Sequence, residues 1–133
     1  HEVFDKTCER SISRGLRVTG SELIGLVPKK VLLDVRTQGE WDSVGKPDGD
    51  KLNLKTYFLE IKRDSFFDFV NEFKTFNISR DHEILVICKS GERSQISAEL
   101  LSKENYKTIN ISDGFEGSSE GEGWINCGLP VKF

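Results

Sequence analysis

Residues 83–94 read Glu-Ile-Leu-Val-Ile-Cys-Lys-Ser-Gly-Glu-Arg-Ser, and this stretch decides the fold. Its run of aliphatic residues ending at Cys88 predicts a short strand of the kind that is buried on both faces in a parallel sheet. The polar residues that follow contain Gly91 and predict a loop, and residues 94–104 predict a helix. Ligands of such sheets bind outside the carboxyl ends of the strands, so Cys88 lies where a functional site is expected.

The segments on either side alternate between strand and helix patterns. Residues 31–35 and 106–111 predict further buried strands, and residues 52–61 contain another. The predicted helices are a capped one over 19–26, a short one from Thr37 through Trp41, and one beginning at Asp64 or Ser65 with a core-facing stripe of Phe66, Phe69, Val70 and Phe73. This alternation predicts an α/β fold with a central, mainly parallel sheet and helices on both faces.

Length and charge limit the function classes. The chain has 133 residues, the length of one domain, and we expect a polar N-terminal arm over 1–17 and a single domain over 18–133. Its 19 basic and 22 acidic side chains give a net charge of −3, so we expect no nucleic-acid partner. The apolar stretches are far shorter than the roughly 20 residues that span a bilayer, so we expect no membrane partner either.

The cysteine count indicates the compartment. Three cysteines argue against a disulfide framework and are typical of a reducing environment, so we expect a cytoplasmic protein. Cys8, in the polar arm, and Cys127, beside Gly128, are interpreted as spectator thiols; Cys127 would resolve a Cys88 adduct only if the tail folded over the site. The chain begins at His1 and contains no Met, so we expect that it is processed or truncated.

The loop after Cys88 is suited to holding an anionic sulfur. A short connection between strand and helix turns its backbone N–H groups inward, with Gly91 supplying any positive φ, and the helix adds the positive end of its dipole. Such an anion cradle favours the thiolate. Lys89 and Arg93 would add positive charge nearby.

Histidine cannot readily activate this thiol. His82 precedes Cys88 by the length of the predicted strand, which corresponds to roughly 20 Å. A Cys–His mechanism therefore lacks its base, and without a Cys-x-x-Cys or a His pair we expect neither a metal nor another cofactor. A cysteine at a strand end is more often a small buried hydrophobe, so the loop that follows Cys88 must carry the functional interpretation.

The chain resembles single-domain rhodanese-like proteins, including a subgroup from bacteria. The matching pieces, which span roughly residues 18–133 in the family's order, are Leu33–Thr37 with Glu40-Trp41, the loop Cys88–Ser94, Leu101–Tyr106, Asn110–Gly117 and Trp124–Pro130. Two departures are Asn105, where the family usually has Gly, and a longer loop after Phe115. The resemblance implies a three-layer α/β sandwich around the parallel sheet.

The resemblance also implies a sulfurtransferase. Cys88 would take a sulfane sulfur from a small anionic donor, thiosulfate or a persulfide, hold it as a persulfide, and pass it to a thiol or protein acceptor. The implied active-site and substrate-binding loop is Lys89, Ser90, Gly91, Glu92, Arg93 and Ser94. Asp34 and Arg36 are expected to support the site through structural hydrogen bonds or ion pairs.

Several alternatives stay open at this stage. Lys89 and Arg93 either attract the donor or, for Arg93, brace the loop through a carboxylate; Ser94 either donates to the persulfide or only caps the helix. A carrier or partner-docking module without free turnover is the second functional hypothesis. Related cysteine phosphatases have five residues between Cys and Arg, whereas four separate Cys88 from Arg93, so a phosphatase is disfavoured.

Overall fold

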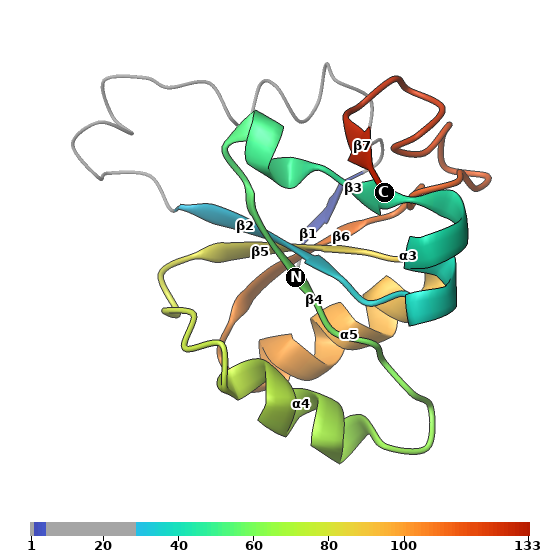
Figure 1. Ribbon diagram of the computed structural model, residues 1–133. Coiled ribbons are helices and arrows are strands. Elements are labelled where there is room, and N and C mark those ends of the chain that lie inside the picture. The colour runs from blue at the N-terminus through green and yellow to red at the C-terminus, as the bar shows by residue number, and fades with distance from the viewer. Residues whose placement is uncertain (1, 5–28) are drawn as a thin grey trace, which may run out of the picture.

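Figure 1 shows the computed structural model of the chain, which describes residues 2–4 and 29–133. The predicted helix over 19–26 and most of the predicted arm over 1–17 lie outside the described residues. No helix of the described segments is long and apolar enough to cross a membrane.

A five-stranded parallel sheet forms the centre of the fold, as the strand pattern predicted. Its order is β1 (Glu2–Phe4), β6 (Lys107–Ile111), β5 (Glu83–Ile87), β2 (Lys30–Asp34) and β4 (Lys55–Phe58). The register pairs Asp34 with Ile87, and the amide of Val35 donates to the Ile87 carbonyl at 3.0 Å. The residues that follow β2 and β5 therefore meet at one edge of the sheet.

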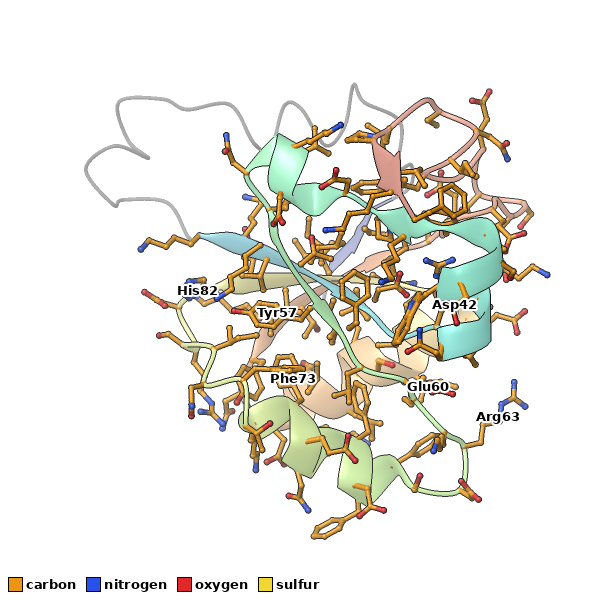
Figure 2. The ribbon with its side chains drawn as sticks, viewed as in Figure 1. Asp42, Tyr57, Glu60, Arg63, Phe73 and His82 are labelled. Carbon is orange, nitrogen blue, oxygen red and sulfur yellow. The ribbon has the colours of Figure 1, made fainter. Side chains whose placement is uncertain are left out.

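One face of the sheet is covered by α4 (Phe66–Lys74) and α5 (Glu92–Lys103), which lie together in Figure 1. The predicted stripe of α4 is confirmed, because Phe69 and Phe73 are buried and Phe66 and Val70 pack against the same core. Tyr57 and Phe73 lie in the space between sheet and α4 (Figure 2). This helical layer places the first turn of α5 against the end of β5.

The other face combines a short helix with irregular chain. It carries α3 (Gln38–Val44), which contributes Val44, the 3-10 helix η1 (Gly49–Leu52) and the C-terminal segment around the fully buried Trp124. A small antiparallel pair joins β3 (Lys46–Pro47) to β7 (Val131–Lys132) on this side. The predicted fold class, α/β with a mainly parallel sheet between covering layers, is confirmed.

Local details differ from the sequence prediction in instructive ways. The strand expected within 52–61 is shortened to β4, because the chain before it forms η1, whose end is marked by the left-handed Asn53 (φ 59°). Helix α5 begins at Glu92 rather than Ser94, so the loop after Cys88 is tighter than expected. Asn105, which stands where the resembled family usually has Gly, adopts the left-handed conformation, with φ 70°. β1 adds an edge strand where no element was expected.

Candidate active site

The loop that follows β5 brings its own backbone onto the Cys88 sulfur. Cys88 is 1% exposed and follows β5 directly, and only three residues separate it from the first residue of α5. Gly91 has φ 101°, and a Cβ there would lie 2.3 Å from the Ser112 carbonyl oxygen. Only glycine fits this position, because it needs both the positive φ and the close approach.

Two groups contact the sulfur. The amide of Gly91 donates to Cys88 Sγ at 3.1 Å, and Ser94 Oγ lies 3.3 Å from it. Both groups belong to the start of α5, where the dipole of the helix is positive. The fixed N–H of Gly91 and the helix N-terminus form an arrangement that stabilises a buried anion, and the Ser94 hydroxyl lies beside them.

Ser94 is itself held by Asn110 of β6. Ser94 Oγ donates to Asn110 Oδ1 at 2.5 Å, and Asn110 Nδ2 donates to the carbonyl of Gly91 at 3.3 Å. Asn110 is 3% exposed and was absent from the predicted site. Its signal in the sequence was a single amide within the apolar strand pattern of residues 106–111.

Arg93 forms a two-pronged ion pair with Glu40. Its Nη1 lies 2.7 Å from Glu40 Oε1 and its Nη2 lies 2.9 Å from Oε2. The hydrogen bonds from Arg93 lower the pKa of Glu40 to about 2, and the same bonds raise the pKa of Arg93. Of the two interpretations of Arg93, the geometry is that of the brace, which ties the active-site loop to α3.

Glu40 also takes part in the N-terminal cap of α3, the helix that carries it. Thr37 Oγ1 accepts from the amide of Glu40 at 3.2 Å, and the amide of Thr37 donates to Glu40 Oε1 at 3.1 Å, which makes a reciprocal cap. One carboxylate therefore serves the cap of α3 and the Arg93 brace. The predicted site residues omitted Glu40, because nothing local in the sequence links it to a residue 53 positions away.

The remaining loop residues face outward. Lys89 and Glu92 are exposed and Ser90 is half-buried. A polar groove of about 770 Å³ runs beside the loop, lined by residues 90–92, Gln95, Asn110, Ser112 and residues 118–120. Among the predicted site residues the structure therefore brings Cys88, Gly91 and Ser94 into contact, Ser90 and Glu92 line the groove, and Lys89 is exposed.

Asp34 and Arg36 form a buried ion pair, in which Arg36 lies against Phe115 on the face of the sheet opposite to α4 and α5. Both side chains are fully buried, and Arg36 Nη2 donates to Asp34 Oδ2 at 2.8 Å and to the Gly45 carbonyl at 2.9 Å. The Arg36 guanidinium also lies 4.0 Å from the centre of the Phe115 ring. This geometry matches the structural role predicted for the pair.

The loop is supported from behind by residues 112–116. The amide of Phe115 donates to the Cys88 carbonyl at 2.8 Å, and that of Glu116 donates to the Lys89 carbonyl at 3.0 Å. Gly114 approaches so closely that a Cβ would lie 2.3 Å from the Lys89 oxygen. The glycine-rich segment 113–123 thus contains a fixed backbone support for the site.

Histidine and the other cysteines lie apart from this arrangement. His82 precedes β5, while Cys88 follows it, and His82 Nδ1 lies 3.0 Å from Asp81 Oδ1. Figure 2 shows His82 on the opposite side of the molecule from Asp42 of α3, the helix that Arg93 ties to the active-site loop. Cys127 is disulfide-bonded, so the expectation of a free spectator thiol at that position is wrong. Cys8 lies outside the described residues.

Comparisons with known proteins agree with this geometry. A sequence model of the rhodanese-like domain matches residues 20–120. The uncharacterized protein RP600 of Rickettsia prowazekii is 41% identical over 108 residues, which cover 77% of this chain and 82% of that protein. The crystal structure of Rv0390 from M. tuberculosis superposes with a TM-score of 0.64 at 33% identity, covering 84% of this chain and 89% of that one.

Two further similarities are partial. The tRNA uridine(34) hydroxylase of Protochlamydia amoebophila is 31% identical over 108 residues, covering 81% of this chain but 29% of that protein. A model of the formiminotransferase domain matches residues 1–38, a range that contains the whole predicted arm. The two family matches therefore overlap between residues 20 and 38.

Proposed function

The chain belongs to the rhodanese-like domain family, and we propose that within it the protein is a sulfurtransferase that carries a sulfane sulfur as a persulfide on Cys88. The observation that carries the proposal is the Gly91 amide, which donates to the buried Cys88 sulfur at 3.1 Å where α5 begins. A preorganised N–H of this kind lowers the energy of an anionic sulfur without reorganisation during the reaction.

The proposed reaction has two steps. The Cys88 thiolate attacks the outer sulfur of thiosulfate, the S–S bond of the donor breaks, and sulfite leaves with the bonding electron pair. A thiophilic acceptor then attacks the terminal sulfur of the Cys88 persulfide, which restores the thiolate. Cyanide serves as acceptor in an assay and gives thiocyanate; in the cell a thiol or a protein would take its place.

The residues around Cys88 divide between chemistry and support. Lys89 is exposed at the loop and would attract an anionic donor. Ser94 would donate its hydroxyl to the anionic sulfur, since its oxygen already lies 3.3 Å away. Arg93 would hold the loop in place through Glu40 rather than bind the donor, because both of its terminal nitrogens contact that carboxylate.

A persulfide carrier without free turnover is the second candidate. Its support is the burial of Cys88, which is 1% exposed and therefore poorly accessible to a free acceptor. The match between this chain and a tRNA uridine(34) hydroxylase covers 29% of that protein, so a segment similar to this chain also occurs within a longer protein. In this candidate, a partner protein would receive the sulfur.

Two measurements distinguish the candidates. Thiocyanate formation from thiosulfate and cyanide, abolished in Cys88→Ser, supports the sulfurtransferase, and turnover no greater than that of the variant across several donors would exclude it. Mass spectrometry after incubation with thiosulfate reports a gain of one sulfur on Cys88. A stable gain with negligible turnover favours the carrier, and no gain at all leaves only a docking role. Hydrolysis of an aryl phosphate would instead revive the phosphatase hypothesis.

A further inference from the structure

A line of hydrogen bonds joins the exposed side of α5 to the Cys88 sulfur. Gln95 Nε2 donates to Glu99 Oε1 at 2.9 Å, and Asn110 Nδ2 donates to Gln95 Oε1 at 3.0 Å. Ser94 Oγ then donates to Asn110 Oδ1 at 2.5 Å, and the same Oγ lies 3.3 Å from Cys88 Sγ. The line therefore ends on the sulfur that the proposed function uses.

The direction of these bonds is fixed. The Glu99 carboxylate only accepts, so the Gln95 side chain must present its NH2 group to Glu99 and its oxygen to Asn110. The second amide proton of Asn110 is taken by the Gly91 carbonyl at 3.3 Å, which also only accepts. The Asn110 amide cannot be reversed without facing two acceptors with an oxygen, so Oδ1 faces Ser94.

This direction determines what Ser94 can offer to the sulfur. A hydroxyl has one proton, and Asn110 takes it. Toward Cys88, Ser94 then presents a lone pair, which accepts a proton from the thiol but opposes a thiolate. In this orientation Ser94 favours the neutral sulfur, whereas the Gly91 amide favours the anion.

We infer that Asn110 is a positioning residue that turns the Ser94 hydroxyl away from Cys88 and releases it only when the sulfur becomes an anion. When the thiol loses its proton to solvent, the Ser94 proton turns from Asn110 Oδ1 to the sulfur. The hydroxyl thus has two positions, and Asn110 sets the energy between them. The inference rests on the proposed function for its role in turnover, but the orientation itself needs no sulfur donor.

The test compares Asn110→Leu, Ser94→Ala and the double variant. The rate of Cys88 alkylation by iodoacetamide at pH 7 is followed by mass spectrometry of the Cys88 peptide. Asn110→Leu frees the Ser94 proton for the thiolate and should be alkylated about five-fold faster than the wild type, the worth of one hydrogen bond. Ser94→Ala should be slower than Asn110→Leu, because it has no hydroxyl to donate to the thiolate. The double variant should match Ser94→Ala, because Asn110 acts through Ser94.

Controls separate this effect from a loosened structure. Thr108 lies two residues before Asn110 on β6, and its buried hydroxyl donates to the Ala98 carbonyl of α5 at 3.0 Å. Thr108→Val removes this hydroxyl and should leave the alkylation rate unchanged. Asn110→Ala replaces Asn110→Leu if the leucine variant does not fold, with the same expectation. A rate at or below that of the wild type overturns the inference, as does a double variant as fast as Asn110→Leu. Failed thiosulfate turnover with the expected alkylation pattern would count against the proposed function alone.

Discussion

Glu40 and Arg93 meet with both carboxylate oxygens facing both terminal nitrogens, at 2.7 and 2.9 Å. The two side chains are 21% and 25% exposed, so the pair is partly shielded from water. It joins the first turn of α5, which carries the loop, to the first turn of α3 on the other side of the sheet edge. A contact between residues 53 positions apart thus sets the position of the Cys88 loop.

Replacing Glu40 by Gln should loosen the loop and destabilise the domain. The substitution keeps the size of the side chain but removes the charge that the bidentate pair needs, so we expect the free energy of unfolding to fall by about 1–2 kcal/mol. Urea denaturation measures this. Glu104→Gln is the matched control, because it breaks an exposed pair with Lys74 and should lower the free energy of unfolding much less than Glu40→Gln does. Equal effects of the two variants would contradict the bracing role.

The same pair predicts an acid dependence of stability. The pKa of Glu40 is lowered from 4.5 to about 2 by the hydrogen bonds from Arg93, so the folded state binds the proton of this carboxyl less readily than the unfolded state. The stabilisation is therefore fully present above about pH 5 and is lost as the pH falls from 4.5 towards 2. Unfolding free energies of the wild type and Glu40→Gln should converge over this range, and a constant difference down to pH 2.5 would contradict it.

The parts of the fold that the sequence predicts are those with local causes. The aliphatic run of β5 and the aromatic stripe of α4 each bury a surface that their own spacing defines, and the left-handed Asn105 follows from its place at the helix end. The start of α5 lies two residues before the predicted one, at Glu92 instead of Ser94. The Ser112 carbonyl, distant in sequence, lies so close to Gly91 that only a glycine fits before the helix, and this contact is not visible in the local sequence.

The residues of the candidate site also divide into those with local causes in the sequence and those that depend on long-range contacts. Cys88 and Gly91 are predictable because strand, loop and helix are consecutive in the chain. Glu40 and Asn110 are not, because each reaches the site through a long-range bond, to Arg93 and to Ser94 respectively. Asn110 also shows why a polar residue in an apolar strand pattern indicates a buried hydrogen bond rather than a break in the strand.

Breaking the buried ion pair of Asp34 and Arg36 should lower the free energy of unfolding strongly, whereas replacing both residues by apolar ones should lower it little. Arg36→Met leaves the fully buried Asp34 carboxylate without its partner, so we expect a loss of about 3–5 kcal/mol in unfolding free energy. The double variant Asp34→Leu with Arg36→Met removes both charges and should recover most of that loss. Urea denaturation of the three proteins measures the difference. A double variant less stable than Arg36→Met would show that the hydrogen bond that Asp34 keeps, accepted from the Arg36 backbone amide at 3.0 Å, outweighs the cost of its buried charge.

Replacing Gly91 by Ala should impair both folding and activity. A Cβ at this position meets the Ser112 carbonyl at 2.3 Å and imposes a positive φ on a side-chain-bearing residue, so Gly91→Ala must move the loop. We expect a loss of at least about 2 kcal/mol in stability and of the Gly91 amide contact to the sulfur, hence of persulfide formation on Cys88. Gly39→Ala, within α3, is the matched control. Its Cβ would lie 3.8 Å from the nearest atom, Thr37 Oγ1, which is an ordinary contact, and the substitution should stabilise the helix by about 0.5–1 kcal/mol. If Gly91→Ala still gained one sulfur from thiosulfate at the wild-type rate, the amide of this residue would not be what holds the anionic sulfur.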